Sequence, residues 1–253
     1  MDINLKKAPQ NVTIIEGFPG FGLVGTIATE YLLDHLDIEK IGSIWFEDMN
    51  PIVAVHDKKV VEPIGIFYHK KKNLVIVHAL TNVAGVEWKL ANIMNDLAKK
   101  LKAKEVISLE CVGALGKGGN VSLDKKIDTK NVNGVGIKKS KAYYYSSRKN
   151  LAWEKTGIDP LNEGMVIGVT ASLLLKLKSA PISCIFVETQ SGLPGSRAAA
   201  EIIKVLDLYL GLKVDPKPLL KKAEAFEGKI KNLMQSSQKV VKSKDEKQLS
   251  YMG

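Results

Sequence analysis

The sequence alternates short runs of β-branched and other apolar residues with longer amphipathic segments, and this alternation limits the possible folds more than any other feature. The runs at 11–16, 105–110 and 181–188 are typical of strands, whereas 86–101 and 196–210 carry apolar residues at helical spacing. Strands that alternate with helices favour a sheet with helices on both faces. We therefore expect a three-layer α/β/α sandwich with a mixed, largely parallel sheet.

Six further segments complete the predicted set of elements. They are helices over 23–36 and 165–177, and strands over 41–46, 52–55, 60–68 and 73–79. These four strands are short and closely spaced, with turn residues between them, which predicts a hairpin or a meander.

The character of the chain changes at Pro216, a residue type that is tolerated in the first turn of a helix. We expect 1–215 to form one α/β domain, 216–235 a C-terminal helix, and 236–253 a flexible basic tail. The apolar seam of this helix packs either on its own domain or on another subunit, and the sequence favours neither decisively.

The net charge of +10 is concentrated in two segments. Residues 117–149 contain nine basic and two acidic residues, and 217–247 contain nine basic and four acidic residues. In 138–149 three tyrosines lie among the cations, a combination that suits stacking on nucleic acid. The chain has only two arginines, however, so a solvated lysine-rich face is favoured over base recognition.

The N-terminus has no apolar core typical of a secretory signal, and no apolar run approaches the roughly 20 residues needed to cross a bilayer. We therefore expect a cytoplasmic protein with no membrane partner. Cys111 and Cys184 fall in or after strand-like runs and are expected to be buried free thiols. They form no Cys-x-x-Cys pair and no histidine lies at metal-site spacing, so no metal site is predicted.

A glycine-rich segment, EGFPGFGLVG at 16–25, joins a predicted strand to a predicted helix. Gly20, Gly22 and Gly25 have the G-x-G-x-x-G spacing that lets a backbone approach a pyrophosphate. A dinucleotide site also needs an acidic residue at the end of the next strand, and Glu47 comes late for this role. The segment is either a nucleotide or small-molecule site or a tight turn that serves as an interface. The residues concerned are Gly17, Phe18, Pro19, Gly20, Phe21, Gly22 and Gly25.

Catalytic residues are not indicated by any clear constellation. His78 is the one histidine at the end of a predicted central strand, where active sites of open α/β sheets gather. Glu110 and Glu188 also end strands, so a carboxylate pair with His78 remains an alternative. We predict no catalytic residue and no cofactor.

Two stretches of the chain resemble the proteasome assembly chaperone family. Residues 15–32 (IEGFPGFGLVGTIATEYL) look like its first strand, glycine loop and helix, and 164–215 are similar to its late helix, strand and final helix. The resemblance implies a phosphorylase/hydrolase-like α/β/α sandwich without established catalytic residues. It also implies a homo-oligomer, with or without a paralogue, that acts as a scaffold for proteasome α-subunits or the core particle.

Some members of that family bind the core particle through a C-terminal hydrophobic-tyrosine-any signature with the tyrosine in the penultimate position. Here the tyrosine is third from the end and Ser250 precedes it, so the chain departs from the pattern. The resemblance implies partner binding by the terminal residues Leu249, Tyr251, Met252 and Gly253. A non-enzymatic scaffold is thus the leading prediction, with a nucleotide-binding enzyme and nucleic-acid binding through 138–149 as the alternatives.

Overall fold

The computed structural model describes residues 3–49, 51–56, 58–113, 140–149, 151–189 and 195–221. In this part of the chain a nine-stranded sheet has the order β1-β3-β6-β7-β2-β8-β11-β9-β10. Its central strands β7, β2, β8 and β11 are mutually parallel, whereas β1, β3, β6 and β9 pair antiparallel to their inner neighbours. The strands are β1 (Ile3–Leu5), β2 (Thr13–Gly17), β3 (Glu39–Ile44), β6 (Ile64–His69), β7 (Leu74–Ala79), β8 (Glu105–Gly113), β9 (Ala142–Ser146), β10 (Asp159–Pro160) and β11 (Ile182–Thr189).

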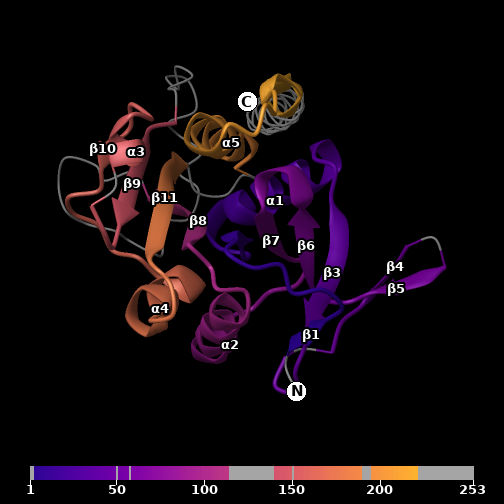
Figure 1. Cartoon of the computed structure of the whole chain (residues 1–253). Helices are drawn as coiled ribbons and strands as arrows, with labels where there is room; N and C mark the ends of the chain where they lie inside the picture. The colour runs from indigo at the N-terminus through magenta and orange to yellow at the C-terminus, as the bar shows by residue number, and fades with distance from the viewer. Residues whose placement is uncertain are drawn as a thin grey trace, which may run out of the picture.

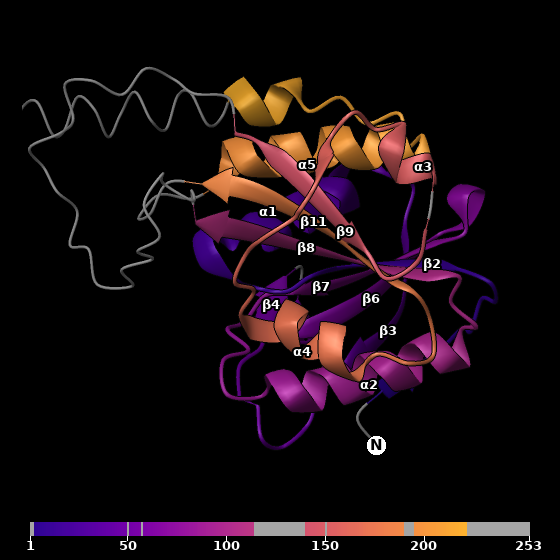
Figure 2. The ribbon, with the colours of Figure 1, turned by 90° about the vertical axis from the view of Figure 1, so that its left-hand side faces the viewer.

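Helices cover both faces of this sheet (Figure 2). On one face lie α1 (Val24–His35) and α5 (Ser196–Leu210), and on the other lie α2 (Glu87–Lys100) and α4 (Gly168–Lys176). A hydrophobic cluster fills the space on each side of the sheet. The predicted three-layer sandwich with a mixed, largely parallel sheet is confirmed.

Strand β2 shows why the central strands have nearly continuous apolar sequences. Ile14 and Ile15 are both fully buried, and they belong to the clusters on opposite faces. Successive side chains of a strand point to opposite faces, so a strand covered on both sides needs apolar residues at consecutive positions. A polar residue in such a strand is therefore unexpected, and Glu16 on β2 is such a residue.

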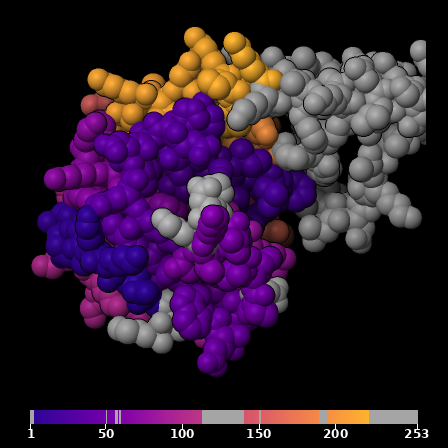
Figure 3. All heavy atoms as spheres, turned by 90° about the vertical axis from the view of Figure 1, so that its right-hand side faces the viewer, coloured from indigo at the N-terminus to yellow at the C-terminus, as the bar shows by residue number. Residues whose placement is uncertain are grey.

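A small hairpin projects from the body beyond β1 and β3 (Figure 1), and Figure 3 views the molecule from that side. Its strands β4 (Ala54–His56) and β5 (Lys59–Val61) form a separate two-stranded sheet. The prediction of a single strand over 60–68 was wrong, because β5 ends before Pro63 and β6 begins after it. Proline has no N–H for the ladder, so it separates the two strands.

No strand was predicted in the basic segment 117–149, but residues 142–146 form β9. Tyr143 donates a hydrogen bond to Glu188 of β11, and Tyr144 lies against Trp153 of α3 (Leu151–Glu154) with ring centroids 5.7 Å apart. Two of the three tyrosines that suggested stacking on nucleic acid are thus held by the fold itself. The alternative of nucleic-acid binding stays untested.

The predicted helix at 216–235 is described only over 217–221. Leu219 is buried in the cluster beneath α5, so the beginning of the seam packs on its own domain. Residues 222–253 lie outside the described part of the chain, together with the predicted tail and its terminal residues Leu249, Tyr251, Met252 and Gly253. Within the described part, no helix combines the length and apolar character that a membrane span requires.

Candidate functional site

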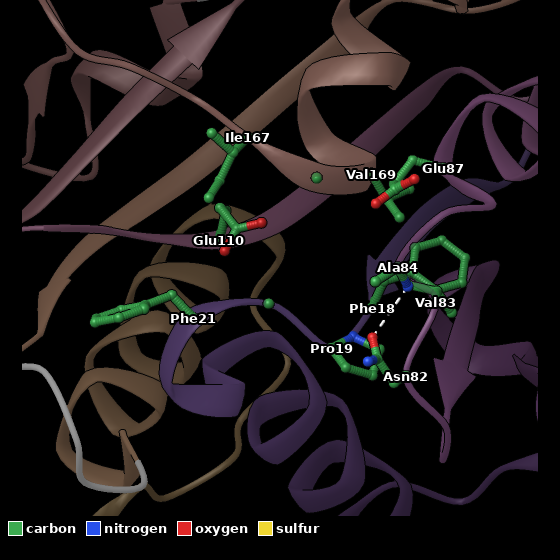
Figure 4. A pocket seen from close by; sticks show the side chains of 12 residues that line it. Phe18, Pro19, Phe21, Asn82, Val83, Ala84, Glu87, Glu110, Ile167 and Val169 are labelled. Atoms are coloured by element: carbon green, nitrogen blue, oxygen red, sulfur yellow. Dashed lines mark hydrogen bonds between the residues drawn. The ribbon is translucent and has the colours of Figure 1, made fainter. Parts of the chain in front are cut away.

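A cavity of about 340 Å³ opens at the carboxyl ends of the central parallel strands. Its wall is formed by 18–21 after β2, 82–84 and Glu87 after β7, Glu110 on β8, and 167–169 at the start of α4 (Figure 4). Strands β7 and β8 lie on either side of β2. The chain continues from β2 into α1 on one face and from β7 into α2 on the other face, so this edge of the sheet is a topological switch point. Ligands of open α/β sheets bind in the crevice at such switch points.

The glycine-rich segment reaches the cavity through its first half. Gly17 and Gly25 instead serve the packing of α1 against the sheet: a Cβ on Gly17 would lie 2.3 Å from the Gly25 carbonyl oxygen, and one on Gly25 would lie 2.6 Å from that of Leu109. Gly22 has a φ of +67°, which an L-residue rarely adopts. These three glycines therefore have structural roles in the turn between β2 and α1.

Gly20 leaves space for the side chain of Glu110. A Cβ on Gly20 would lie 2.5 Å from Glu110 Oε1, so any larger residue would displace the carboxyl group. In a dinucleotide site the same glycine leaves space for a pyrophosphate. A carboxylate at that place repels a phosphate, so the geometry argues against the predicted nucleotide alternative at this loop.

Glu110 is joined to the buried Glu16 by a chain of two hydroxyl groups. Ser108 Oγ donates a hydrogen bond to Glu16 Oε1 and lies 2.8 Å from Thr170 Oγ1, which in turn lies 3.2 Å from Glu110 Oε2. The residues come from β2, β8 and α4, and they lie on the face that α2 and α4 cover. The four groups therefore follow one another in the order carboxyl, hydroxyl, hydroxyl, carboxyl.

The carboxyl groups of Glu16 and Glu110 each accept one backbone hydrogen bond as well. The Phe18 N–H donates to Glu16 Oε2 at 3.0 Å, and the Cys111 N–H donates to Glu110 Oε1 at 3.0 Å. We call Glu16, Ser108, Thr170 and Glu110 the carboxyl pair cluster.

Burial disfavours the charged form of both carboxyl groups. It raises the pKa of Glu16 to about 7, against the opposing effect of the hydrogen bonds from Ser108 and Phe18. It raises the pKa of Glu110 to about 7 as well, and the nearby charge of Glu16 adds to the shift. The pair thus binds a proton more readily than exposed glutamates do.

The hydrogen count explains how the cluster can be satisfied. Three contacts link the four groups, but Ser108 and Thr170 supply only one hydrogen each. The third hydrogen has to come from one carboxyl group, and it can come from either end because both hydroxyl groups can reverse. One shared proton therefore completes the cluster and leaves a single negative charge on it.

A third buried carboxyl group, Glu105, lies at the other end of β8 and on the opposite face. It accepts hydrogen bonds from Ser183 Oγ, from Tyr209 OH at 2.7 Å and from Trp153 Nε1 at 3.4 Å. Trp153 is fully buried and stacks on Tyr209 with centroids 3.8 Å apart. This group is tied to α3, α5 and β11 and does not line the cavity.

The predicted alternative of His78 with Glu110 and Glu188 is not assembled. His78 faces α1, where Nδ1 lies 2.8 Å from Thr29 Oγ1 and Nε2 lies 2.8 Å from Glu30 Oε2. Glu110 faces α4 on the other side of the sheet, and Glu188 accepts its hydrogen bond from Tyr143. The sheet therefore separates the histidine from both carboxyl groups.

Cys111 and Cys184 are buried and free, as predicted. Burial raises the pKa of the Cys111 thiol to about 12, so it stays neutral at physiological pH. In the described ranges, no group of three or more histidine, cysteine, aspartate and glutamate residues is arranged to hold a metal ion.

The family model for PAC2 matches residues 14–234, which is most of the chain. The chain belongs to the PAC2 family. The match includes the strand–glycine loop–helix segment and confirms the resemblance to the proteasome assembly chaperone family that the sequence suggested.

Relatives of this PAC2 protein cover nearly its whole length. The Pyrococcus furiosus protein PbaA, described as an archaeal homolog of proteasome-assembly chaperone, has a crystal structure that covers 100% of this chain and 99% of its own, with 26% identity and a TM-score of 0.76. The structure of PbaB from the same organism, described as an archaeal proteasome activator, covers 91% and 97%, with 19% identity and a TM-score of 0.72. An uncharacterised Methanocaldococcus jannaschii protein is 23% identical over 92% of this chain and 89% of its own.

Proposed function

We propose that this PAC2 protein is a non-enzymatic chaperone that self-associates and binds proteasome α-subunits or the assembled core particle. Support comes from membership of the family and from the likeness to PbaA, which is described as an archaeal homolog of proteasome-assembly chaperone. This support comes from related proteins, so self-association and partner binding also need support from features of this chain itself.

The observation that carries the proposal is the exposed apolar surface of the projecting hairpin. Four aliphatic side chains in and beside it are more than half exposed, and Val55 is 71% exposed. They are Ile52, Val53, Val55 and Val60. The hairpin stands away from the body (Figure 1), and the described residues leave these side chains exposed. Exposed apolar patches of this kind are typical of protein–protein contacts.

Binding through the C-terminal tail remains a proposal from the sequence. Several copies of a tail on one oligomer raise the effective concentration of each terminal peptide, so weak individual contacts suffice. The basic tail suits an acidic partner surface, and Leu249, Tyr251, Met252 and Gly253 are the residues proposed to dock.

Native mass spectrometry tests both parts of the proposal. The full chain is measured alone, then mixed with α-subunits and with core particles. We expect a closed homo-oligomer that binds one of these partners, and a chain that ends at Gln235 should keep the oligomer but lose the partner. A monomer that ignores both partners would overturn the proposed function.

A matched pair of variants assigns the role of the hairpin. Val55→Glu with Val60→Glu places two charges on the projecting apolar surface. On dilution, we expect this variant to dissociate into smaller species at a protein concentration at least tenfold higher than the parent chain does. Leu208→Glu alters an aliphatic residue on α5 that is also more than half exposed, and serves as the control. If both variants keep the oligomer intact, the hairpin is not part of the interface.

A further inference from the structure

The cavity at the carboxyl ends of the strands combines apolar walls with an acidic floor. Phe18, Val83, Ile167 and Val169 supply apolar surface, and Glu110 lies between Phe21 and Ile167 at the edge of the open space (Figure 4). Its volume of about 340 Å³ falls within the range of about 300–1,000 Å³ that is usual for small-ligand sites.

Within the described part of the chain, the two charged residues that line the cavity are both acidic. Glu87 and Glu110 line it, and Glu16 lies behind Glu110 at the end of the hydroxyl chain. None of the described residues that line the cavity is a lysine, arginine or histidine. An anion would be repelled, whereas a cation would gain a charge-assisted hydrogen bond in a partly dehydrated place.

We infer that the cavity binds a primary ammonium group on a short aliphatic stem, with the ammonium at Glu110 and the stem against Phe18, Ile167 and Val169. An ammonium has three hydrogens and no acceptor, so it can donate to the carboxylate of Glu110, which lines the cavity. The aliphatic stem gains from removal of apolar surface from water on both sides. The same chemistry occurs in free alkylamines and in lysine side chains.

Ligand binding is coupled to the shared proton of the carboxyl pair cluster. An ammonium bound at Glu110 favours the ionised carboxylate there, so the shared proton moves through the two hydroxyl groups to Glu16. A proton on Glu110 competes with the ligand, and affinity therefore rises with pH until Glu110 is ionised. The other described titratable groups around the pair are Cys111, Cys184 and Glu87, and burial raises the pKa of both thiols.

The test is a titration of the isotope-labelled full chain followed by amide NMR shifts of the cavity residues. The probes are n-butylamine and Nα-acetyl-lysine N-methylamide, with 1-butanol and sodium butyrate as the neutral and anionic controls. At pH 8 we expect saturable shifts at Gly20, Val83 and Gly168 with an ammonium probe, and affinity at least tenfold above that of either control. Binding by the lysine amide assigns the site to a protein side chain, and binding by butylamine alone assigns it to a free amine.

Charge variants distinguish this site from general attraction to an acidic protein. Glu110→Gln should weaken the ammonium probe at least tenfold, whereas Glu154→Gln, which removes an exposed carboxyl group on α3, should leave its affinity unchanged. Glu16→Gln keeps the Glu110 carboxylate and removes the nearby charge that helps to raise the pKa of Glu110, so its affinity at pH 6 should exceed that of the parent chain severalfold.

Failure of this inference is separate from failure of the proposed function, because the readout needs neither an oligomer nor a proteasome subunit. Equal affinity in the parent chain and Glu110→Gln would overturn the inference, and so would equal affinity for butylamine and 1-butanol. The melting temperature of Glu110→Gln, expected to be at least that of the parent chain, shows that a loss of binding is not a loss of folding.

Discussion

Strand β8 carries two buried glutamates whose surroundings differ in the number of hydrogens that they supply. Glu105 accepts from three side-chain donors, Trp153, Ser183 and Tyr209. Glu110, near the other end and on the opposite face, accepts one backbone N–H and is otherwise joined through Thr170 to a second carboxyl group. One site is rich in donors, and the other has one hydrogen too few.

This difference separates a structural group from a responsive one. A carboxyl group with a full set of donors holds neighbouring elements together, and Glu105 ties α3 and α5 to the sheet. A pair of carboxyl groups that lacks one hydrogen has to take a proton or a cation from outside. The carboxyl pair cluster also borders the cavity, so solvent or a ligand can supply what is missing.

Glu105→Gln is the change with the largest expected effect. The amide brings two hydrogens to a place where the neighbours already donate, so at least one buried donor loses its acceptor. We expect a loss of about 2 kcal/mol in the free energy of unfolding, measured by urea denaturation at pH 8. Glu154→Gln on the surface of α3 should change it by less than about 0.5 kcal/mol. A Glu105→Gln protein as stable as the parent chain would contradict the view that Glu105 is surrounded by hydrogen-bond donors.

The same substitution at the carboxyl pair cluster should have the opposite sign. Glu16→Gln or Glu110→Gln supplies the missing hydrogen covalently, so each should stabilise the protein by about 1–2 kcal/mol at pH 8. The double variant supplies one hydrogen too many and should gain nothing further. Denaturation curves of the four proteins at one pH decide this, and additive gains would rule out a shared proton.

The pH dependence follows from the raised pKa values. Between the ordinary glutamate pKa of 4.5 and about 7, the folded protein keeps protons that the unfolded chain has released. The unfolding free energy therefore falls as pH rises through this window, and the penalty is complete above it. Each single glutamine variant should show a smaller fall than the parent chain.

Much of the fold was predictable because its signals are local. The apolar runs at 11–16 and 181–188 and the amphipathic segment at 196–210 correspond to β2, β11 and α5. Strand β9 was missed because the basic residues around 142–146 obscured a short run of tyrosines. Its pairing with β11 joins residues that are far apart in the sequence, so no local pattern indicates it.

The candidate site was predictable only in part. The glycine-rich segment and Glu110 were recognised, but Glu16, Ser108 and Thr170 were not assigned to a site. Ser108 and Thr170 are 62 residues apart, and they meet only because α4 packs over β8. A glutamate inside an otherwise apolar buried strand was the available signal, since such a residue needs an internal partner.

The smallest expected effect comes from Thr170→Val, which keeps the shape of the side chain and removes the hydroxyl link. Glu110 loses a donor that lowers its pKa, so that pKa should rise further above about 7. We expect about 1 kcal/mol of destabilisation at pH 8, together with a shift of the Glu110 carboxyl titration to higher pH by carbon-detected NMR. Ser183→Ala removes one hydroxyl from the Glu105 site and should destabilise by a similar amount without moving the Glu110 titration. If both variants move it equally, the two ends of β8 are electrostatically coupled, and the distinction between a structural and a responsive carboxyl group does not hold.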